Sequence, residues 1–277
     1  MRATRRASQR RAEIIIILVM LIVGIIFVLP YVWMLLDSFK PMKEIIKGKS
    51  FWPEDFTWKN YVNVFTKAPI LSWLRNSVLT TVIGTVIMLF TSTLAGFVFA
   101  KYEFRGKNFL FLFILATMMV PQQATMIPSF LLIRRLGLYD NLASLVLPRM
   151  VGGFGIFLCR QFIADIPDDL MDAAQIDGAS DMYIYANLIL PLIMPAISAL
   201  AIFTFLGLWN EYLGPLLYLS KTTNMTMPLA LSFFSTQHNQ DIGAVMAAAT
   251  VIMLPVTVVF LAFQKQFVEG IAITGMK

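Results

Sequence analysis

The strongest constraint on this chain is a run from Ile14 to Leu36, 23 residues without a single charge. A helix needs about 20 apolar residues to cross a bilayer, whereas the apolar core of a cleaved signal peptide has only about 7 to 15. The run therefore predicts a retained transmembrane helix. Further long apolar runs lie at 78–100, 109–133, 142–158, 193–219 and 242–263. Since 58% of the 277 residues are hydrophobic, we predict an all-α integral membrane protein with six transmembrane helices.

The distribution of basic residues predicts the orientation of these helices. The tail before the first run carries five arginines, Arg2, Arg5, Arg6, Arg10 and Arg11. A dense basic cluster beside the first span favours the cytoplasmic side, so we expect both termini inside, N-in/C-in. Seven basic residues in segment 37–76 oppose this orientation, but long loops are weaker signals. Attraction of the tail to anionic lipid explains the net charge of +6 without nucleic acid.

Several kinds of chemistry are not expected in this chain. Cys159 and His238 are its single cysteine and histidine, so neither an internal disulfide nor a His/Cys metal site is predicted. The sequence Gly-Lys-Ser at 48–50 resembles the end of a phosphate loop, but Lys43 stands where the first glycine is required and no strand is predicted before it. No nucleophile or acid–base set is evident. We therefore expect no enzyme activity and no metal or cofactor bound by this chain.

A second unusual segment, 168–192, carries five aspartates among apolar runs. Pro167 is predicted as the first residue of a short helix, because negative charge at Asp168 and Asp169 suits the positive end of a helix dipole. Gly178 can take the left-handed conformation that ends helices. The first half of the segment is thus predicted to be a short acidic helix that ends in a turn.

The second half of this segment is predicted to be another short helix. Ser180 has the side chain of an N-cap, and Pro191 pushes Leu190 out of helical geometry, so the helix should stop there. The result is a compact helix-turn-helix. Ala173 and Ala174 leave a shallow face that another protein could approach closely, with carboxylates beside it for basic side chains.

The segment resembles a known family at these residues. Asp172-Ala173-Ala174, three residues, Gly178, nine residues and then Leu188-Ile189-Leu190-Pro191 match the spacing of the Glu-Ala-Ala signature of binding-protein-dependent ABC importer permeases. Asp172 stands where the family usually has Glu, and Leu188 where it usually has Ile. Because Asp172 is one methylene shorter than Glu, the resemblance implies a contact with a partner that is longer than in relatives or bridged by water. Other fragments, at 38–45, 60–65, 74–78, 120–128, 136–141 and 208–219, are similar to the smaller permease of maltose-type carbohydrate importers.

This resemblance implies a type I ABC importer permease fold in the cell membrane and a set of partners. The partners are a second homologous permease, two ATPase subunits that bind ATP and magnesium, an extracytoplasmic solute-binding protein, and a sugar substrate. It implies three regions: 1–72 with the tail, first helix and external segment, a five-helix core at 73–264, and a cytoplasmic tail at 265–277. The ATPase-coupling loop would span about 165–191, with candidate residues Asp172, Ala173, Ala174, Asp177, Gly178, Ala179, Leu190 and Pro191.

Polar residues inside the predicted spans are candidates for a substrate pathway, because polar groups are unfavourable in lipid. Gln122 and Gln123 lie between Pro121 and Pro128, where we expect a bend with freed carbonyls. Their amides suit sugar hydroxyls, or could only satisfy the bent backbone. The other candidates are Asn210, Glu211 and Tyr212, against a structural role for the same residues. Arg149 could pair with Glu211, or extend to the interface as a structural residue.

The last external loop holds candidate contacts to the binding protein, Gln237, His238 and Asn239, although a solvated loop is an equal alternative. The function that these expectations predict is sugar import by an ATP-driven ABC transporter. The alternative is a secondary transporter for a small polar solute, but that class should couple through ionisable residues inside its spans, and few are present. The sequence does not specify which sugar is carried.

Overall fold

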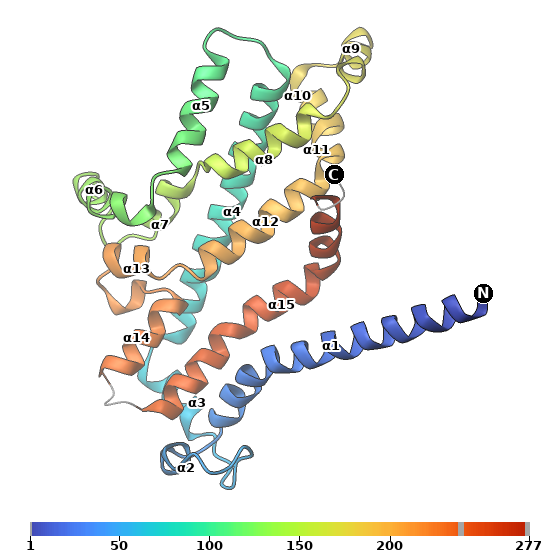
Figure 1. The fold of residues 1–277 in the computed structure, drawn as a ribbon. Helices are drawn as coiled ribbons and strands as arrows, with labels where there is room; N and C mark the ends of the chain where they lie inside the picture. The colour runs from blue at the N-terminus through green and yellow to red at the C-terminus, as the bar shows by residue number, and fades with distance from the viewer. Residues whose placement is uncertain (1, 238–240, 275–277) are drawn as a thin grey trace. The chain divides into compact units, whose positions relative to one another are not determined.

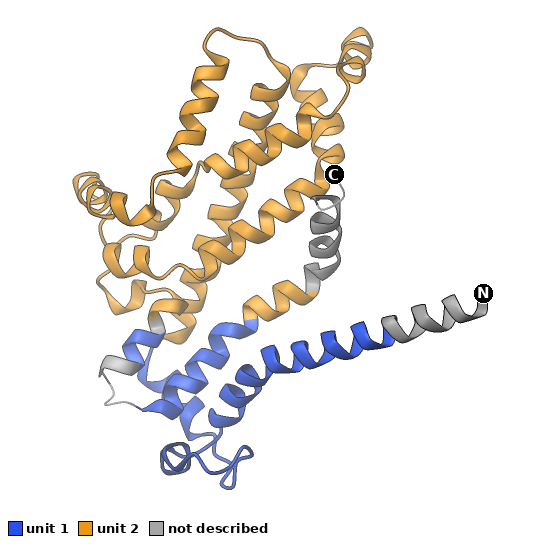
Figure 2. Cartoon of the chain, viewed as in Figure 1, with its two compact units in different colours: residues 1–68, 231–254 blue, residues 69–230, 255–277 orange. Residues whose placement is uncertain are grey.

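The computed structural model describes residues 2–237 and 241–274, and every regular element within those ranges is helical (Figure 1). The chain divides into two compact units, shown in Figure 2. Unit 1 comprises residues 1–68 and 231–254, and unit 2 comprises residues 69–230 and 255–277. In order, the elements are α1 (Arg2–Asp37), α2 (Met42–Lys47), α3 (Lys59–Lys67), α4 (Ile70–Lys101), α5 (Lys107–Met118), α6 (Gln122–Arg135), α7 (Ala143–Val146), η1 (Leu147–Arg149), α8 (Gly153–Ala164), α9 (Asp168–Ile176), α10 (Asp181–Ile184), η2 (Tyr185–Ile189), α11 (Leu190–Leu192), α12 (Met194–Trp209), α13 (Leu213–Tyr218), η3 (Thr222–Asn224), α14 (Met227–Gln237) and α15 (Ile242–Thr274).

Six segments account for the predicted spans. Three helices are each long and apolar enough to cross a bilayer alone: Glu13–Asp37 in α1, Ile70–Lys101, which is α4, and Ile242–Leu261 in α15. Three bent pairs would bring the number to six. Helix α5 meets α6 at 100°, α7 with η1 meets α8 at 44°, and α10 through α11 meets α12 at 79°. The all-α architecture predicted from the sequence is confirmed, and the number of spans reaches six only if each bent pair is counted as one broken span.

Two of the breaks can be compared with the predicted boundaries. The expected bend near Pro121 is confirmed, since Pro121 has extended backbone (ψ 136) immediately before α6, whereas Pro128 lies inside α6. The prediction of one span at 193–219 was wrong. Helix α12 ends at Trp209, and α13 is a separate helix whose Gly214 N–H is bonded by the side chain of Glu211 (2.9 Å). A carboxylate that satisfies a helix-start N–H favours a new helix over continuation.

Close approach of helices organises unit 2, in which α4 packs along α8 and α12. A Cβ atom on Gly96 of α4 would lie 2.6 Å from the Cβ of Cys159 on α8, and one on Gly155 would lie 2.3 Å from Ser92 Oγ. Neither distance is tolerable, so both positions depend on the absence of a side chain. Small residues are the usual means of bringing membrane helices together.

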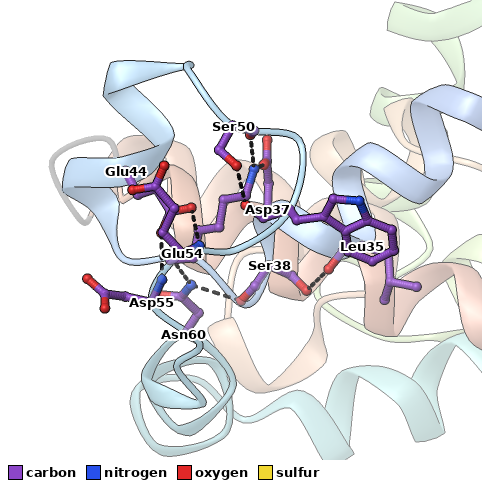
Figure 3. Close-up of polar contacts among 10 residues, drawn as sticks. Leu35, Asp37, Ser38, Glu44, Ser50, Glu54, Asp55 and Asn60 are labelled. Carbon is purple, nitrogen blue, oxygen red and sulfur yellow. Dashed lines mark hydrogen bonds and ion pairs between the residues drawn. The ribbon is translucent and has the colours of Figure 1, made fainter.

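Unit 1 contains a polar cluster around the turn after α1, shown in Figure 3. The buried Lys40 Nζ donates to Asp37 Oδ1 (2.7 Å) and to the carbonyl of Ser50 (2.8 Å). Asn60 Nδ2 donates to the carbonyls of Ser38 and Lys40, at 2.8 Å each. Gly48 in the Gly-Lys-Ser sequence has φ 58 and ends α2. The phosphate-loop match is therefore a helix cap, as its missing first glycine indicated.

Candidate functional site

The acidic segment forms two short helices joined by a turn, as the sequence predicted. Helix α9 begins at Asp168 after Pro167, which is the N-cap residue rather than the first helical residue. Gly178 has φ +84, the left-handed conformation that glycine adopts readily. Ser180 caps α10 by accepting the N–H of Tyr183 (3.3 Å). We call the segment 167–184 the α9–α10 loop.

The second helix of the segment does not stop before Pro191, so that prediction was wrong. The chain passes through η2, which is a π-helical turn, and continues as α11, which contains Pro191. A proline ring clashes with the carbonyl four residues earlier in a regular α-helix. A wider π turn changes that spacing, and the chain bends only at Ile193 (φ −97, ψ 14).

One side of the α9–α10 loop is held by the core of unit 2. Met171 is buried, and Ala174 and Ala179 pack against the same apolar cluster. The other side is open: Asp172, Ala173, Asp177 and Gly178 are exposed, and the side chain of Ile176 is 87% exposed. We call the residues Asp172, Ala173, Ile176 and Asp177 the outer face of the loop. The sequence placed Ala174 on the same face as Ala173, but in the structure Ala174 faces the protein's own core.

A lysine at the end of α4 fixes the beginning of α9. Lys101 Nζ donates to the carbonyl of Ile166 (2.5 Å) and to Asp168 Oδ1 (2.6 Å). The lysine side chain is 3% exposed, whereas that of Asp168 is 79% exposed. The bond to the carbonyl is the better shielded from water of the two. Because Asp168 is exposed, water weakens its ion pair with Lys101. Lys101 was not a sequence candidate, since a lysine after an apolar span is ordinary at a membrane boundary.

The second feature of unit 2 is a cavity of about 200 Å³ at the broken ends of its helices. Its walls come from α4, α6, α7, η1, the end of α12, α13 and the segment after η3. Of the predicted pathway residues, Gln122, Gln123 and Glu211 line it, and Asn210 and Tyr212 do not. The amide of Asn210 instead donates to the carbonyl of Leu206 in its own helix (3.0 Å). The cavity therefore brings together residues from two predicted spans that are far apart in sequence.

An ion pair lies in the wall of this cavity. Arg149 Nη2 and Glu211 Oε2 are 2.5 Å apart, and the two side chains are 31% and 17% exposed. Glu211 uses its other oxygen, Oε1, for the N–H of Gly214. The pairing of Arg149 with Glu211 was one of two alternatives from the sequence, and the structure confirms it. Two charges that the sequence placed inside predicted apolar spans are brought together, in keeping with the energetic penalty of isolated charges in a membrane.

The α4 side of the cavity is polar. Ser77 Oγ accepts the N–H of Met227 (2.7 Å), and Thr80 Oγ1 donates to the carbonyl of Asn76 (2.8 Å). The hydroxyl of Thr226 also lies in the wall; the residue is 5% exposed and its oxygen has no hydrogen-bond partner among the described residues. Buried hydroxyls normally have a partner, so an unpartnered one at a cavity points to a ligand or water.

A turn beside the cavity depends on Asp140, which sequence analysis missed. Asp140 has φ 60, and its N–H donates to the carbonyl of Tyr218 (2.8 Å). Its Oδ1 accepts the N–H groups of Ser220 (3.1 Å) and Lys221 (3.0 Å) and the amide of Asn224 (3.1 Å). Burial alone would raise the pKa of this carboxyl, but these bonds outweigh it and hold the pKa at about 2. The tolerance of Asp for positive φ is a sequence signal that could have indicated a turn here.

We expect Asp140→Ala to destabilise unit 2, because the variant loses these bonds and strains a positive-φ position. The carboxyl pKa is below its ordinary value of 3.8, so the charged form stabilises the fold above that pH by about 2 kcal/mol. That contribution falls as pH drops from 3.8 towards 2. Thermal unfolding of the purified protein measures the loss. Asp140→Asn is the control, since it tolerates positive φ and should lose less; equal stability of all three proteins at neutral pH would contradict this account.

The third group of predicted residues lies at the edge of the described structure. His238 and Asn239 are outside the described residues, and the side chain of Gln237 is not described. Among the residues that are described, no group of three or more His, Cys, Asp or Glu side chains could hold a metal ion.

Comparison with known proteins identifies the family. Residues 92–273 match the family described as "Binding-protein-dependent transport system inner membrane component". The arabinooligosaccharides transport system permease protein AraQ of Halalkalibacterium halodurans is 32% identical over 92% of this chain and 93% of its own. The lactose transport system permease protein LacG of Rhizobium radiobacter is 30% identical over 95% and 96%. The chain belongs to this family: it is a multi-pass membrane permease subunit of an ABC transporter, not an enzyme.

A solved structure has the same fold. The crystal structure of a bacterial ABC transporter involved in the import of the acidic polysaccharide alginate contains a chain with a TM-score of 0.81. The match covers 93% of this chain and 97% of that chain at 24% sequence identity. The type I importer permease fold expected from the sequence is therefore confirmed.

Proposed function

We propose that this chain is one of two permease subunits of an ATP-driven importer that carries a sugar, most simply an oligosaccharide, into the cell. The names of similar proteins support the substrate class. Relatives transport arabinooligosaccharides and lactose, and another, the diacetylchitobiose uptake permease NgcG of Streptomyces coelicolor, is 28% identical over 96% of this chain. The alternative of a secondary transporter is not consistent with membership of a binding-protein-dependent family.

The observation that carries the coupling proposal is the asymmetry of the α9–α10 loop. Its inner side is packed on the core and pinned by Lys101, while its outer face exposes Ile176 beside Asp172 and Asp177. An exposed apolar side chain flanked by carboxylates suits a cleft that has an apolar floor and basic rims. We assign this face to the ATPase subunit. The side chain of Asp172 is one methylene shorter than that of Glu, so we expect its contact with the ATPase to be longer than in relatives or bridged by water.

The proposed mechanism couples ATP binding to alternating access. Closure of two ATPase subunits, which hold ATP and magnesium, moves the α9–α10 loop of each permease and exposes the pathway alternately to either side. This chain binds no nucleotide in the scheme. An N-in/C-in orientation puts the loop on the ATPase side and the external segment towards the solute-binding protein. Gln237, His238 and Asn239 stay candidates for contact with that protein.

The cavity lined by Gln122, Gln123 and Glu211 is our candidate for part of the sugar pathway. Its position at helix breaks supports the assignment, because broken helices in transporters present free backbone groups to substrates. Amide and hydroxyl side chains match sugar hydroxyls as both donors and acceptors. Asn210 and Tyr212 do not line this cavity and stay candidates for another part of the pathway.

Reconstitution tests the proposed function. The chain, its partner permease and the ATPase are incorporated into liposomes with ATP inside, and uptake of labelled oligosaccharides is measured with and without the cognate binding protein. We expect uptake that needs both ATP and the binding protein. Uptake driven by an ion gradient without ATP, or no uptake of any saccharide by an assembled complex, would overturn the proposal.

A further inference from the structure

The cavity in unit 2 has a balanced charge. Among its lining residues, Arg149 carries the positive charge and Glu211 the negative charge. The remaining polar wall consists of neutral amides and hydroxyls, including Gln122, Gln123 and Thr226. A volume of about 200 Å³ is below the about 300–1,000 Å³ of pockets for drug-sized ligands, so it suits a single glycosyl unit rather than a whole oligosaccharide.

The two charged side chains differ in how many of their hydrogen-bonding groups have a partner. Both oxygens of Glu211 are engaged, one by Arg149 and one by the N–H of Gly214. A guanidinium has five N–H groups, and within the part of the chain that the structure describes, the Arg149 side chain donates a hydrogen bond only to Glu211. Arg149 therefore retains donors for a ligand while Glu211 cancels its charge.

The rest of the wall provides further hydrogen-bond donors. Helix α6 starts at Gln122 with no side-chain cap, and Gln122 and Gln123 line the cavity, so the positive end of the helix dipole lies beside it. The buried hydroxyl of Thr226, which has no hydrogen-bond partner among the described residues, is an independent indication that a hydroxyl of a ligand or of water is bound here. Without Glu211, Arg149 and this helix end together would form a site for a carboxylate.

We propose that this cavity binds one neutral glycosyl unit, and that Glu211 determines its charge preference by neutralising Arg149, so that uronic acids are excluded. This inference rests on the proposed function, since it names the substrate class of the same pathway. The carboxylate of a uronic acid would meet the carboxylate of Glu211 and lose its hydration without gaining an unpaired cation. Neutral hydroxyls bind without that penalty.

Protection of an introduced cysteine tests this inference at the cavity itself. Ser129 lines the cavity, and the native Cys159 is fully buried and gives little background. The purified full complex carrying Ser129→Cys is treated with a maleimide in the presence of methyl glycosides of glucose, galactose and mannose. The matched probes are the corresponding methyl uronosides, which differ only in the carboxylate. Ligand binding in the cavity should slow the labelling.

The variants separate charge from loss of packing. With Glu211 present, neutral glycosides should protect and uronosides should not. Glu211→Gln keeps an acceptor for the N–H of Gly214 but leaves Arg149 without an ion pair. The uronoside concentration needed for protection should therefore be at least about tenfold lower than in the complex that keeps Glu211. Arg149→Gln should not gain uronoside binding, and the double variant Arg149→Gln, Glu211→Gln should restore the neutral preference. If Glu211→Gln does not assemble, uronoside protection in the double variant would overturn the inference.

The outcomes also distinguish this inference from the proposed function. Unchanged preference in Glu211→Gln, in a complex that still imports saccharide, would overturn the charge assignment alone. The absence of protection by any neutral glycoside would show that the cavity is not a glycosyl site, whether or not uptake occurs. Failure of saccharide uptake in the reconstituted complex would overturn the proposed function itself.

Discussion

Gly178→Val should abolish sugar uptake in the reconstituted complex while unit 2 stays folded. Gly178 has φ +84, and a left-handed backbone costs an L residue at least about 1–2 kcal/mol. Among the described residues, no heavy atom other than those of Gly178 and its two chain neighbours lies within 4 Å of the position of the missing Cβ, so the strain arises from the backbone and not from a clash. The chain should relieve it by changing the turn between α9 and α10. That change would displace the outer face of the loop.

The control for this variant is Gly178→Asn, because Asn tolerates positive φ better than other residues with a side chain. It should keep most of the uptake activity. ATP hydrolysis and uptake are measured together, so that a complex that assembles but does not couple can be recognised. Equal uptake by Gly178→Val and the wild-type chain would show that the left-handed turn is not needed for coupling.

Lys101→Met should uncouple ATP hydrolysis from uptake. The variant removes two charge-assisted bonds, to the carbonyl of Ile166 and to Asp168, from a side chain that is only 3% exposed. The shielded bond to the carbonyl contributes about 1.5–3 kcal/mol, and the ion pair to the exposed Asp168 contributes less than about 1 kcal/mol. Methionine fills similar space but cannot hold the start of α9. We expect uptake per ATP hydrolysed to fall by about tenfold or more.

Two variants serve as comparisons for Lys101→Met. Lys107→Met removes a lysine with a similar ion pair, 2.7 Å to Glu103, that does not touch the α9–α10 loop. Asp168→Asn should have a small effect, because the aspartate is 79% exposed and the carbonyl bond persists. If Lys101→Met behaves like Lys107→Met, Lys101 has no part in coupling.

Local rules explain why the α9–α10 loop could be predicted well. The positions of Pro167, Gly178 and Ser180 each depend on backbone geometry within a few residues, and all three features are present within one residue of the expected place. Which residues form the inner side of the loop, packed on the core of unit 2, could not be predicted from such local rules. Whether Ala174 faces a partner or the protein's own core depends on packing against α4 and α8, which is a long-range property.

The cavity was predicted in part for a similar reason. The general penalty on isolated charges in a membrane made the pairing of Arg149 with Glu211 one of two alternatives from the sequence, and the structure shows the ion pair. The break after Trp209 depends on which N–H and carbonyl groups find partners in three dimensions, and the continuous span predicted at 193–219 missed it. Asn210 was predicted to lie inside that span, but it follows the last residue of α12 and its amide bonds back to the carbonyl of Leu206.

Site-specific crosslinking is the most direct test of the central claim that the outer face of the loop is the contact with the ATPase. A cysteine at Ile176, where the side chain is 87% exposed, is compared with one at Ala174, which packs inward. In membranes that contain the whole complex, Ile176→Cys should crosslink to the ATPase subunit with a yield that changes with nucleotide, and Ala174→Cys should not. No ATPase captured from Ile176→Cys under any nucleotide condition would contradict the account.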